Sequence, residues 1–424
     1  MIVLSYLIAR KIEVMSSLRK KPSSLFSARL AFIVGLGLFF TLSSVKADNR
    51  VVAWGAGLIT NSIDRYDYGQ SVIPANLTNA VCVAGGGRHS LALKTDGALQ
   101  GWGDDSAGQT DLPPGSNYIA IACGYLDSVL LQTNGIVLAV GDNGDPVARP
   151  TAVPVGLSNV VAIAAGQYHC LALKADGTVV AWGTSTNPDT YVANVDYGQS
   201  AVPAGLSNVV AIAAGGWHSL ALKADGTVTG WGRTDYGQAS IPPGVTNVVA
   251  IAAGLADSLV LEANGKLVAW GDNTYGQTNV PAGLSNVVAI AAGWWHNLAL
   301  KSNGTVVVWG AGGGSSPYVD FMQTNVPAGL SNVVQIAAGS AHSLVLVGTA
   351  PPVTQATLNH PKFGTNGFSF WLPTQNGRVY QLEFKNSLTD NVWLSLPLKA
   401  GIGGLLQWTD TAAVLMRFYR VNQW

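Results

Sequence analysis

Residues 161–183 read VAIAAGQYHCLALKADGTVVAWG, and this stretch decides the fold because the chain repeats it. A seventh, partial copy begins at Val334 and stops at Gly348. The glycine at the sixth position of the copies recurs after 38, 42, 49, 39, 39 and 46 residues. A period near 40 residues is typical of the blades of a β-propeller. The other five complete copies begin at Val81, Ile119, Val210, Val249 and Val288.

Each copy contains three short segments with strand character. An apolar run precedes the glycine, an alternating run follows the histidine position, and a third run ends in Trp-Gly. The Asp-Gly or Asn-Gly pair between the last two runs, as at Asp176-Gly177, predicts a two-residue hairpin because these residues accept positive φ angles. A Tyr-Gly-Gln stretch and a Val-Pro or Ile-Pro step follow, and we expect them to form an outer strand and the crossover to the next blade.

The missing end of the seventh copy lies at the other end of the chain. Val51-Val52-Ala53-Trp54-Gly55 matches the last five positions of the repeat. The sequence therefore predicts an all-β fold in which residues 48–350 form a seven-bladed β-propeller. N- and C-terminal strands would share the last blade, so that circular closure removes the unpaired edges.

The order Ala-Gly, His-Ser, Asp-Gly-Thr, Trp-Gly and Tyr-Gly-Gln resembles the regulator of chromosome condensation repeat, which builds seven-bladed β-propellers. The resemblance covers Val51 to about Gly348. The second copy departs most, with Asp127 at the histidine position, Val140 at the tryptophan position and no Tyr-Gly-Gln, and the fifth copy has Asp257 at the histidine position. The family includes a nuclear guanine-nucleotide exchange factor, plant photoreceptors and secreted bacterial binding proteins. The resemblance thus implies a scaffold and not one activity.

Residues 1–47 have the layout of a secretory signal peptide. Basic residues precede an apolar run from Leu30 to Leu42, and small residues precede a cleavage site after Ala47. The run is shorter than the roughly 20 residues of a membrane span, which argues against the alternative of a membrane anchor. We expect cleavage and export to a secreted, cell-surface or periplasmic location, with no stable membrane span afterwards.

Composition narrows the classes of function. The chain has 23 basic and 23 acidic residues, and removing residues 1–47 leaves 16 basic and 22 acidic residues, a net charge of −6. A protein with this balance is not expected to bind nucleic acid. The sequence has no phosphate-binding glycine loop with Lys-Ser or Lys-Thr and no Gly-x-Ser-x-Gly elbow. We predict no catalytic residue, no metal and no cofactor.

Five of the six histidines occupy one repeat position, with aspartate in the other two blades. A metal site or a catalytic role is an alternative, but one structural role per blade explains the periodicity better. In that role a ring nitrogen would bind backbone groups near a turn. The tryptophans of the Trp-Gly step are expected to pack between blades. The five histidines are His89, His169, His218, His296 and His342.

The two positions between the repeated glycine and the histidine position vary from copy to copy. Because these positions belong to equivalent turns, their side chains should project from one face of the disc. Several aromatic rings with one guanidinium group are typical of a binding hot spot, although capping of strand ends is the alternative. The candidate binding residues are Arg88, Tyr125, Tyr168, Trp217, Trp294 and Trp295.

The three cysteines, Cys82, Cys123 and Cys170, cannot all pair with one another. Each replaces a small residue of the other copies, so we expect buried thiols that behave as small apolar residues. A disulfide or a reactive nucleophile is the alternative.

Residues 351–424 lie after Pro351-Pro352, where the repeats stop. Alternating segments such as 368–372 and 378–384 suggest a small antiparallel β-sandwich. The segment resembles a module that ends many large exported bacterial proteins, and its role stays open.

The sequence therefore favours an exported, non-enzymatic and monomeric scaffold that binds another protein, or a glycan, through the aromatic turns. Guanine-nucleotide exchange is the first alternative, and it needs a cytosolic GTPase that an exported protein would not meet. An extracellular hydrolase is the second, and the sequence offers no acid–base pair for it.

Overall fold

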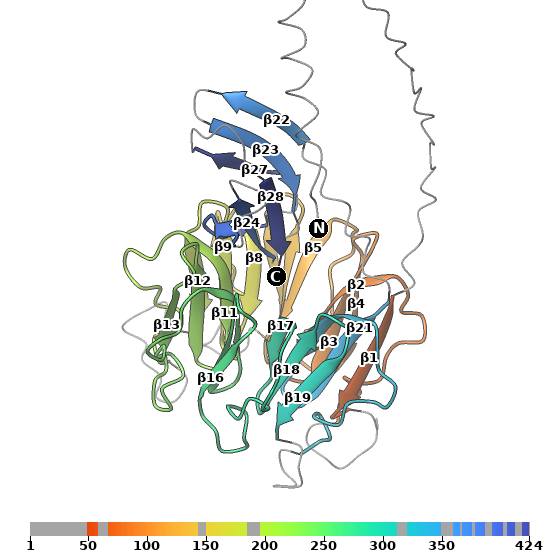
Figure 1. The fold of residues 1–424 in the computed structure, drawn as a ribbon. Helices are drawn as coiled ribbons and strands as arrows, with labels where there is room; N and C mark the ends of the chain where they lie inside the picture. The colour runs from red at the N-terminus through yellow and green to blue at the C-terminus, as the bar shows by residue number, and fades with distance from the viewer. Residues whose placement is uncertain are drawn as a thin grey trace, which may run out of the picture.

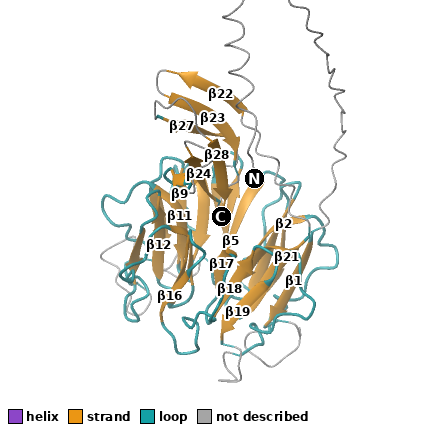
Figure 2. Ribbon diagram, in the orientation of Figure 1, coloured by secondary structure: helices purple, strands orange, loops and turns teal. Residues whose placement is uncertain are grey.

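The computed structural model describes residues 49–57, 67–142, 150–184, 196–311, 320–348, 359–364, 367–374, 378–385, 392–401, 405–411 and 418–423. All regular elements in these ranges are β-strands (Figures 1 and 2). None of the described residues belongs to a helix that could span a membrane. The predicted signal peptide lies outside the described residues.

Residues 50–347 form seven three-stranded antiparallel sheets, and each sheet is one blade. The inner strands are β2 (Ala80–Gly85), β5 (Tyr118–Cys123), β8 (Val160–Ala165), β11 (Val209–Ala214), β14 (Val248–Ala253), β17 (Val287–Ala292) and β20 (Val333–Ala338). The middle strands are β3 (His89–Lys94), β6 (Asp127–Gln132), β9 (His169–Lys174), β12 (His218–Lys223), β15 (Asp257–Glu262), β18 (His296–Lys301) and β21 (His342–Val347). The outer strands are β4 (Leu99–Gly103), β7 (Val137–Gly141), β10 (Val179–Gly183), β13 (Val228–Gly232), β16 (Leu267–Gly271), β19 (Val306–Gly310) and β1 (Arg50–Gly55).

The ring closes through the last blade, as the sequence predicts. Strand β1 pairs with β21, with Trp54 opposite Ser343 and Gly55 opposite His342. The same register joins Trp231 to Ser219 in the complete blade of β12 and β13. The inner strands β2 and β20 contact each other, so no blade is left without a neighbour.

The hydrophobic cores lie between blades. In β12, Leu220 and Leu222 belong to the core shared with the following blade, whereas Ala221 belongs to the core shared with the preceding one. This division follows from the alternation of side chains along a strand. The small alanines of the inner strands fit the narrow end of the wedge, and the buried tryptophans near the outer strands fill its wide end.

The hairpins between middle and outer strands differ from the predicted two-residue turns. In the first blade β3 ends at Lys94 and β4 begins at Leu99, and the Lys94 N–H donates to the Ala98 carbonyl at 2.9 Å. Gly97 has a φ of 79°, while Asp96 keeps a negative φ and its carboxylate accepts the Ala98 N–H at 3.0 Å. The turn is therefore a longer one in which aspartate caps the backbone and only the glycine is left-handed.

The expected outer fourth strand is absent from the described residues of every blade. The Tyr-Gly-Gln segment forms turns in which side chains satisfy the backbone. The Gln199 side-chain oxygen accepts the Tyr197 N–H at 2.8 Å, and Asp196 accepts the Gly198 N–H at 3.0 Å. These N–H groups are not available to a strand ladder, and the prolines that follow have none to offer.

The C-terminal region forms two small antiparallel sheets around one core, which agrees with the predicted β-sandwich. Phe370, Leu382 and Trp408 are buried in that core. One sheet contains β22 (Asn359–Gly364), β23 (Gly367–Pro373) and β27 (Leu405–Asp410). The other contains β24 (Val379–Lys385), β25 (Leu394–Ser395), β26 (Lys399–Ala400) and β28 (Phe418–Gln423).

This C-terminal module lies over one face of the propeller (Figure 1). Val379 and Leu398 join the hydrophobic core that connects the fourth, fifth and sixth blades, and the Leu398 N–H donates to the Ala224 carbonyl at 2.9 Å. Ala224 belongs to a hairpin between a middle and an outer strand. We call this side the hairpin face, and the opposite side, which bears the turns between inner and middle strands, the turn face.

Candidate functional site

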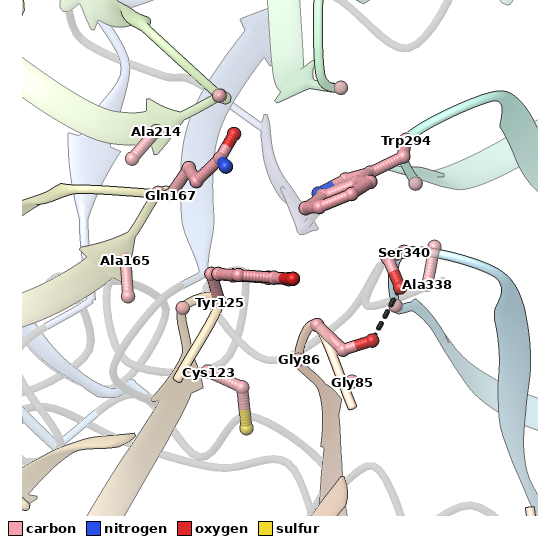
Figure 3. Close-up of a pocket in the computed structure, with 18 of the residues that line it drawn as sticks. Gly85, Gly86, Cys123, Tyr125, Ala165, Gln167, Ala214, Trp294, Ala338 and Ser340 are labelled. Atoms are coloured by element: carbon pink, nitrogen blue, oxygen red, sulfur yellow. Dashed lines mark hydrogen bonds between the residues drawn. The ribbon is translucent and has the colours of Figure 1, made fainter. Parts of the chain in front are cut away.

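A cavity of about 80 Å³ lies on the propeller axis at the turn face (Figure 3). Residues from all seven blades line it, and they come from the ends of the inner strands and from the turns that follow. We call it the axial cavity. It brings together the repeated glycine and the variable positions that the sequence singles out.

The repeated glycine is required by close approach on two sides. A Cβ atom at Gly215 would lie 2.5 Å from the Gly254 carbonyl oxygen of the next blade and 2.3 Å from Cε1 of His218 in its own blade. Equivalent contacts recur at each of the seven positions. The glycines therefore form a closed ring in which each Cα packs against the next blade.

The repeated histidines join neighbouring blades through serine side chains, and not through the backbone groups that the sequence suggests. Nε2 of His218 lies 2.9 Å from Oγ of Ser258 in the next blade. The Ser258 hydroxyl donates its own hydrogen to the Gln238 carbonyl at 2.8 Å. The other pairs are His89 with Ser128, His169 with Ser219, His296 with Ser343 and His342 with Ser90, at 2.9 to 3.0 Å.

This arrangement fixes the protonation of the imidazoles. Because the serine hydroxyl donates elsewhere, it must accept the Nε2–H of the histidine. Burial lowers the pKa of His89 to about 4 and that of His218 to about 3, and the other three histidines fall to about 3 for the same reason. The rings are thus neutral at pH 7. Nowhere in the described ranges do three histidine, cysteine, aspartate or glutamate side chains form a group that could hold a metal.

The two aspartates at the histidine position complete the ring with changed partners. Asp257 accepts a hydrogen bond from Nδ2 of Asn297 at 2.8 Å, and Asp127 accepts one from Sγ of Cys170 at 3.6 Å. Burial raises the pKa of both carboxyl groups to about 7. Cys170 and Asn297 stand at the position that holds serine in the other blades, so each aspartate meets a changed partner in the next blade.

The cysteines do not form disulfides. Cys170 is fully buried, but its bond to Asp127 makes it more than the small apolar residue that the sequence predicts. Cys82 and Cys123 are half-buried, and Cys123 lines the axial cavity. Burial raises the pKa of all three thiols, which disfavours a reactive thiolate.

The repeated tryptophans also connect blades. Nε1 of Trp231 donates to the Gln199 carbonyl of the preceding blade at 2.8 Å. Trp182 donates to the Pro150 carbonyl at 2.7 Å, which replaces the missing Tyr-Gly-Gln segment of the second blade. The repeated polar positions therefore hold blades together.

The six candidate binding residues divide into two groups. Tyr125 and Trp294 come from blades on opposite sides of the axis and point over the axial cavity (Figure 3). Their ring centroids are 5.1 Å apart with an interplanar angle of 28°. Trp295 packs edge-on against Trp294, with centroids 5.4 Å apart. The structure thus brings three of the six together.

Arg88, Tyr168 and Trp217 lie around this centre. The Arg88 guanidinium lies 4.7 Å from the ring centroid of Tyr68 and 5.3 Å from that of Tyr125. Tyr168 accepts a hydrogen bond from Nε2 of Gln167 at 3.1 Å. Trp217 packs edge-on against a further tyrosine, away from the cavity.

Sequence reasoning missed a second cluster on this face. The Arg233 guanidinium lies 4.7 Å from the centroid of Tyr197, 5.1 Å from that of Trp217 and 5.6 Å from that of Tyr236. Arg233 also pairs with Asp235 at 2.8 Å. The sequence feature that could have revealed this cluster is the tyrosine of Tyr-Gly-Gln. It follows the end of the outer strand, and that end lies on the turn face.

Charge differs between the two faces. The loops after the outer strands are tied to the turns, since the Asp104 N–H donates to the Arg88 carbonyl at 3.0 Å and the Asp272 N–H donates to the Ala256 carbonyl at 2.9 Å. In their described parts, these loops and turns carry two cations, Arg88 and Arg233. The same parts carry nine aspartates: Asp67, Asp104, Asp105, Asp111, Asp142, Asp196, Asp235, Asp272 and Asp320. The hairpins of the opposite face carry Lys94, Lys174, Lys223, Lys266 and Lys301 with Asp96, Asp176, Asp225 and Glu262.

The repeats match a known family. The model of the regulator of chromosome condensation (RCC1) repeat matches residues 80–109, 160–187, 209–238, 248–277 and 287–313. The chain is an RCC1-like β-propeller. The divergent second blade and the split seventh blade lie outside these matches. No curated protein has a sequence that matches this chain.

Solved structures support the same fold. Prp20p from Saccharomyces cerevisiae is 19% identical with a TM-score of 0.56, over 71% of this chain and 91% of Prp20p. The yeast RCC1 protein Prp20 in complex with Kap60 is 20% identical with a TM-score of 0.55, over 78% and 95%. Human WBSCR16 is 19% identical with a TM-score of 0.52, over 70% and 98%. At these identities the likeness shows the RCC1-like fold.

Proposed function

We propose that this RCC1-like propeller is an exported, non-enzymatic scaffold that binds another protein through its turn face, centred on Tyr125, Trp294 and Trp295. One observation carries the proposal. The repeated polar positions are occupied in joining blades, whereas the non-repeating aromatic residues of separate blades meet over the axis. They do so on the face opposite the C-terminal module, where a partner has access.

A protein is the partner class that the relatives support. The structure of Prp20p was described with its binding to Gsp1p and histones, and Prp20 was crystallised with Kap60. Propellers of this fold therefore serve as binding surfaces for other proteins. Nucleotide exchange would need residues that act on a GTPase, and the likeness to Prp20p extends to the fold alone.

The buried groups support a non-enzymatic role. Asp127 and Asp257 have raised pKa values that would suit an acid catalyst, but both side chains are at most 1% exposed and bonded within the blade ring. A substrate could not reach them without separating two blades. Their perturbed pKa values are explained by structural burial.

Export is supported by the position of the predicted cleavage site. Strand β1 starts at Arg50, three residues after Ala47, and it completes the last blade. Cleavage after Ala47 would leave the whole propeller intact. Intact mass and fractionation of the native protein test this part: a product that begins at Asp48 outside the cytoplasm is expected, and a cytosolic product with residues 1–47 would contradict it.

Binding is tested by affinity capture from the medium and surface fraction of the producing cells. We expect Trp294→Ala and Trp217→Ala to lose the partners that the wild-type protein captures. The matched control is Ile136→Ala, because Ile136 is an apolar side chain, 43% exposed, on a hairpin of the opposite face. Unfolding midpoints of all variants should be measured. Equal capture by wild type and Trp294→Ala would refute the assignment of the face.

A further inference from the structure

We propose that the turn face binds a cationic polypeptide segment, one arginine or lysine side chain of which enters the axial cavity. This inference rests on the proposed function, because it specifies the chemistry of the partner at the same face. Three layers of the site support the inference: the atoms around the axis, the mouth of the cavity and the rim of the turn face.

The first layer is a ring of buried polar atoms around the axis, five of which are histidine acceptors. Nδ1 of each of the five repeated histidines, Oδ1 of Asp127 and Oδ1 of Asp257 have no hydrogen-bond partner among the described residues. Each of the seven atoms lies behind a glycine that lines the cavity. A Cβ at Gly124, for example, would lie 2.3 Å from Oδ1 of Asp127, and a Cβ at Gly293 would lie 2.7 Å from Nδ1 of His296.

These side chains are at most 1% exposed, so their lone pairs are little screened by water. Since the histidine protons are fixed on Nε2 by the serines, each Nδ1 is the electron-rich nitrogen of its ring. The five Nδ1 atoms produce a negative potential on the axis. A cation at the centre of the ring is favoured by these five nitrogens, and by the two carboxyl groups when they are ionised.

The second layer is the mouth of the cavity. Tyr125, Trp294 and Gln167 point over it from three blades (Figure 3). Aromatic faces attract cations, and guanidinium groups stack on them readily. Oε1 of Gln167 has no hydrogen-bond partner in the described part of the chain and can accept an N–H from a bound group.

The third layer is the rim of aspartates. Nine aspartates lie in the loops that follow the outer strands, against two guanidinium groups on this face, and both of these groups already lie over tyrosine rings. Asp104 is 8% exposed, and its Oδ2 has no hydrogen-bond partner among the described residues. The hairpin face has five lysines and four acids, so the excess of negative charge belongs to the turn face.

The size of the cavity fits one side chain. About 80 Å³ corresponds to roughly three water molecules at about 30 Å³ each, which is comparable to the volume of one guanidinium group. It is small for a folded element or a bulky cofactor. A polypeptide with several positive charges can place one side chain on the axis and others near the rim. An anionic glycan or membrane surface would be repelled by the same carboxylates.

The test uses a labelled ten-residue peptide of alternating glycine and arginine, titrated into the full chain by fluorescence anisotropy. The matched peptide replaces arginine with citrulline, which keeps the shape and removes the charge, and a third peptide alternates glycine and glutamate. We expect at least tenfold weaker binding of the citrulline peptide and no binding of the glutamate peptide. Equal binding of the arginine and citrulline peptides would overturn the proposal.

Two sets of variants place the site. Trp294→Leu removes the π face and should weaken binding about tenfold, while Trp294→Phe retains a π face and should stay within about threefold. Asp105→Asn with Asp320→Asn should weaken binding about threefold at low salt and have no effect at high salt. Asn at these positions can still accept the Thr110 and Met322 N–H groups.

Asp225→Asn is the matched control, since it removes one exposed charge from the hairpin face, and its binding should equal that of the wild type. If Trp294→Leu binds the arginine peptide as tightly as the wild type, the attraction is general electrostatics and the cavity assignment is wrong. If capture of the natural partner depends on Trp294 but the arginine peptide neither binds nor competes, the proposed function stands and the cationic inference fails. If the arginine peptide binds but no captured protein depends on Trp294, the cationic inference stands and the proposed function fails.

Discussion

The turn between an inner and a middle strand places two kinds of position side by side. Its first residue is glycine in every blade, because a Cβ there would lie 2.3 to 2.8 Å from a carbonyl oxygen of the next blade. Its last residue is histidine or aspartate, and its side chain bonds to the next blade. The two residues between them carry side chains as different as Gly216 and Trp294. The comparison shows that close backbone contacts between blades and buried hydrogen bonds close the ring. The two intervening positions are not needed for closure, so their side chains can vary and bind a partner.

The largest difference between the two kinds of position should appear on adding one methyl group. In Gly293→Ala, the new Cβ would lie 2.5 Å from both the Gly339 carbonyl oxygen and Cε1 of His296. Neither neighbour can move without opening a blade boundary, so we expect a loss of at least about 3 kcal/mol in the free energy of unfolding. Urea denaturation followed by tryptophan fluorescence measures it.

The control is Gln167→Ala at a variable position, which should cost less than about 1 kcal/mol. An equal loss in the two variants would mean that the variable positions are structural too.

The second effect concerns the two aspartates within the histidine ring. Their pKa is raised to about 7, so between pH 4 and pH 7 the native state holds protons that the unfolded chain has released. Stability contributed by these carboxyls is therefore lost as pH rises through this range. Asp127→Asn with Asp257→Asn should gain several kcal/mol relative to wild type between pH 4 and pH 7, at most about 4 kcal/mol per site, and little further above that.

The histidines act in the opposite direction, because their lowered pKa means that the unfolded chain binds more protons below pH 6.5. Stability from this source falls as pH decreases from about 6.5 to about 3 in wild type and variant alike. Urea midpoints at four pH values separate the two contributions. A variant whose stability stays parallel to that of wild type from pH 4 to pH 7 would contradict buried, protonated aspartates.

The third effect is a change of partner at one blade boundary. Asp257→His alone sets an imidazole Nε2–H against the Asn297 amide group, and Asn297→Ser alone removes the donor that Asp257 accepts. Each single variant should lose about 1 to 2 kcal/mol, and the double variant should recover most of the loss because it recreates the His–Ser pair of the other blades. Additive losses in the double-mutant cycle would show that the two positions do not act as a pair.

Much of this architecture could be predicted from the sequence, because each structural position of the repeat occurs seven times along the chain. The blade number, the shared last blade and the small two-sheet module follow from spacing and alternation. The four-stranded blade was wrong, since propensity does not reveal that Gln199 and Asp196 would take up the backbone N–H groups of their own loop. The histidine partners were missed because they belong to the next blade, 40 or more residues away in most cases.

The site was only partly readable for a related reason. Equivalence of the turns placed Tyr125 and Trp294 on one face, but not their meeting over the axis, which depends on side chains that cross from opposite blades. The cluster of Arg233, Tyr197 and Trp217 combines a turn with loops from two blades, and no single copy of the repeat displays it. An alignment of the repeat copies shows which positions are equivalent, but it does not show which residues of different copies touch each other.

The smallest effect tests whether a variable position adds to stability at all. Arg88 is half-buried, lies over Tyr68 and Tyr125, and forms no ion pair with a described residue. Its stacking should contribute less than about 1 kcal/mol, so Arg88→Gln should shift the unfolding midpoint only slightly. Removing a positive charge from a face whose loops carry nine aspartates should at the same time strengthen binding of the arginine peptide. Weaker peptide binding with unchanged stability would instead make Arg88 a contact for an anionic group, and would reverse the sign of charge expected for the partner.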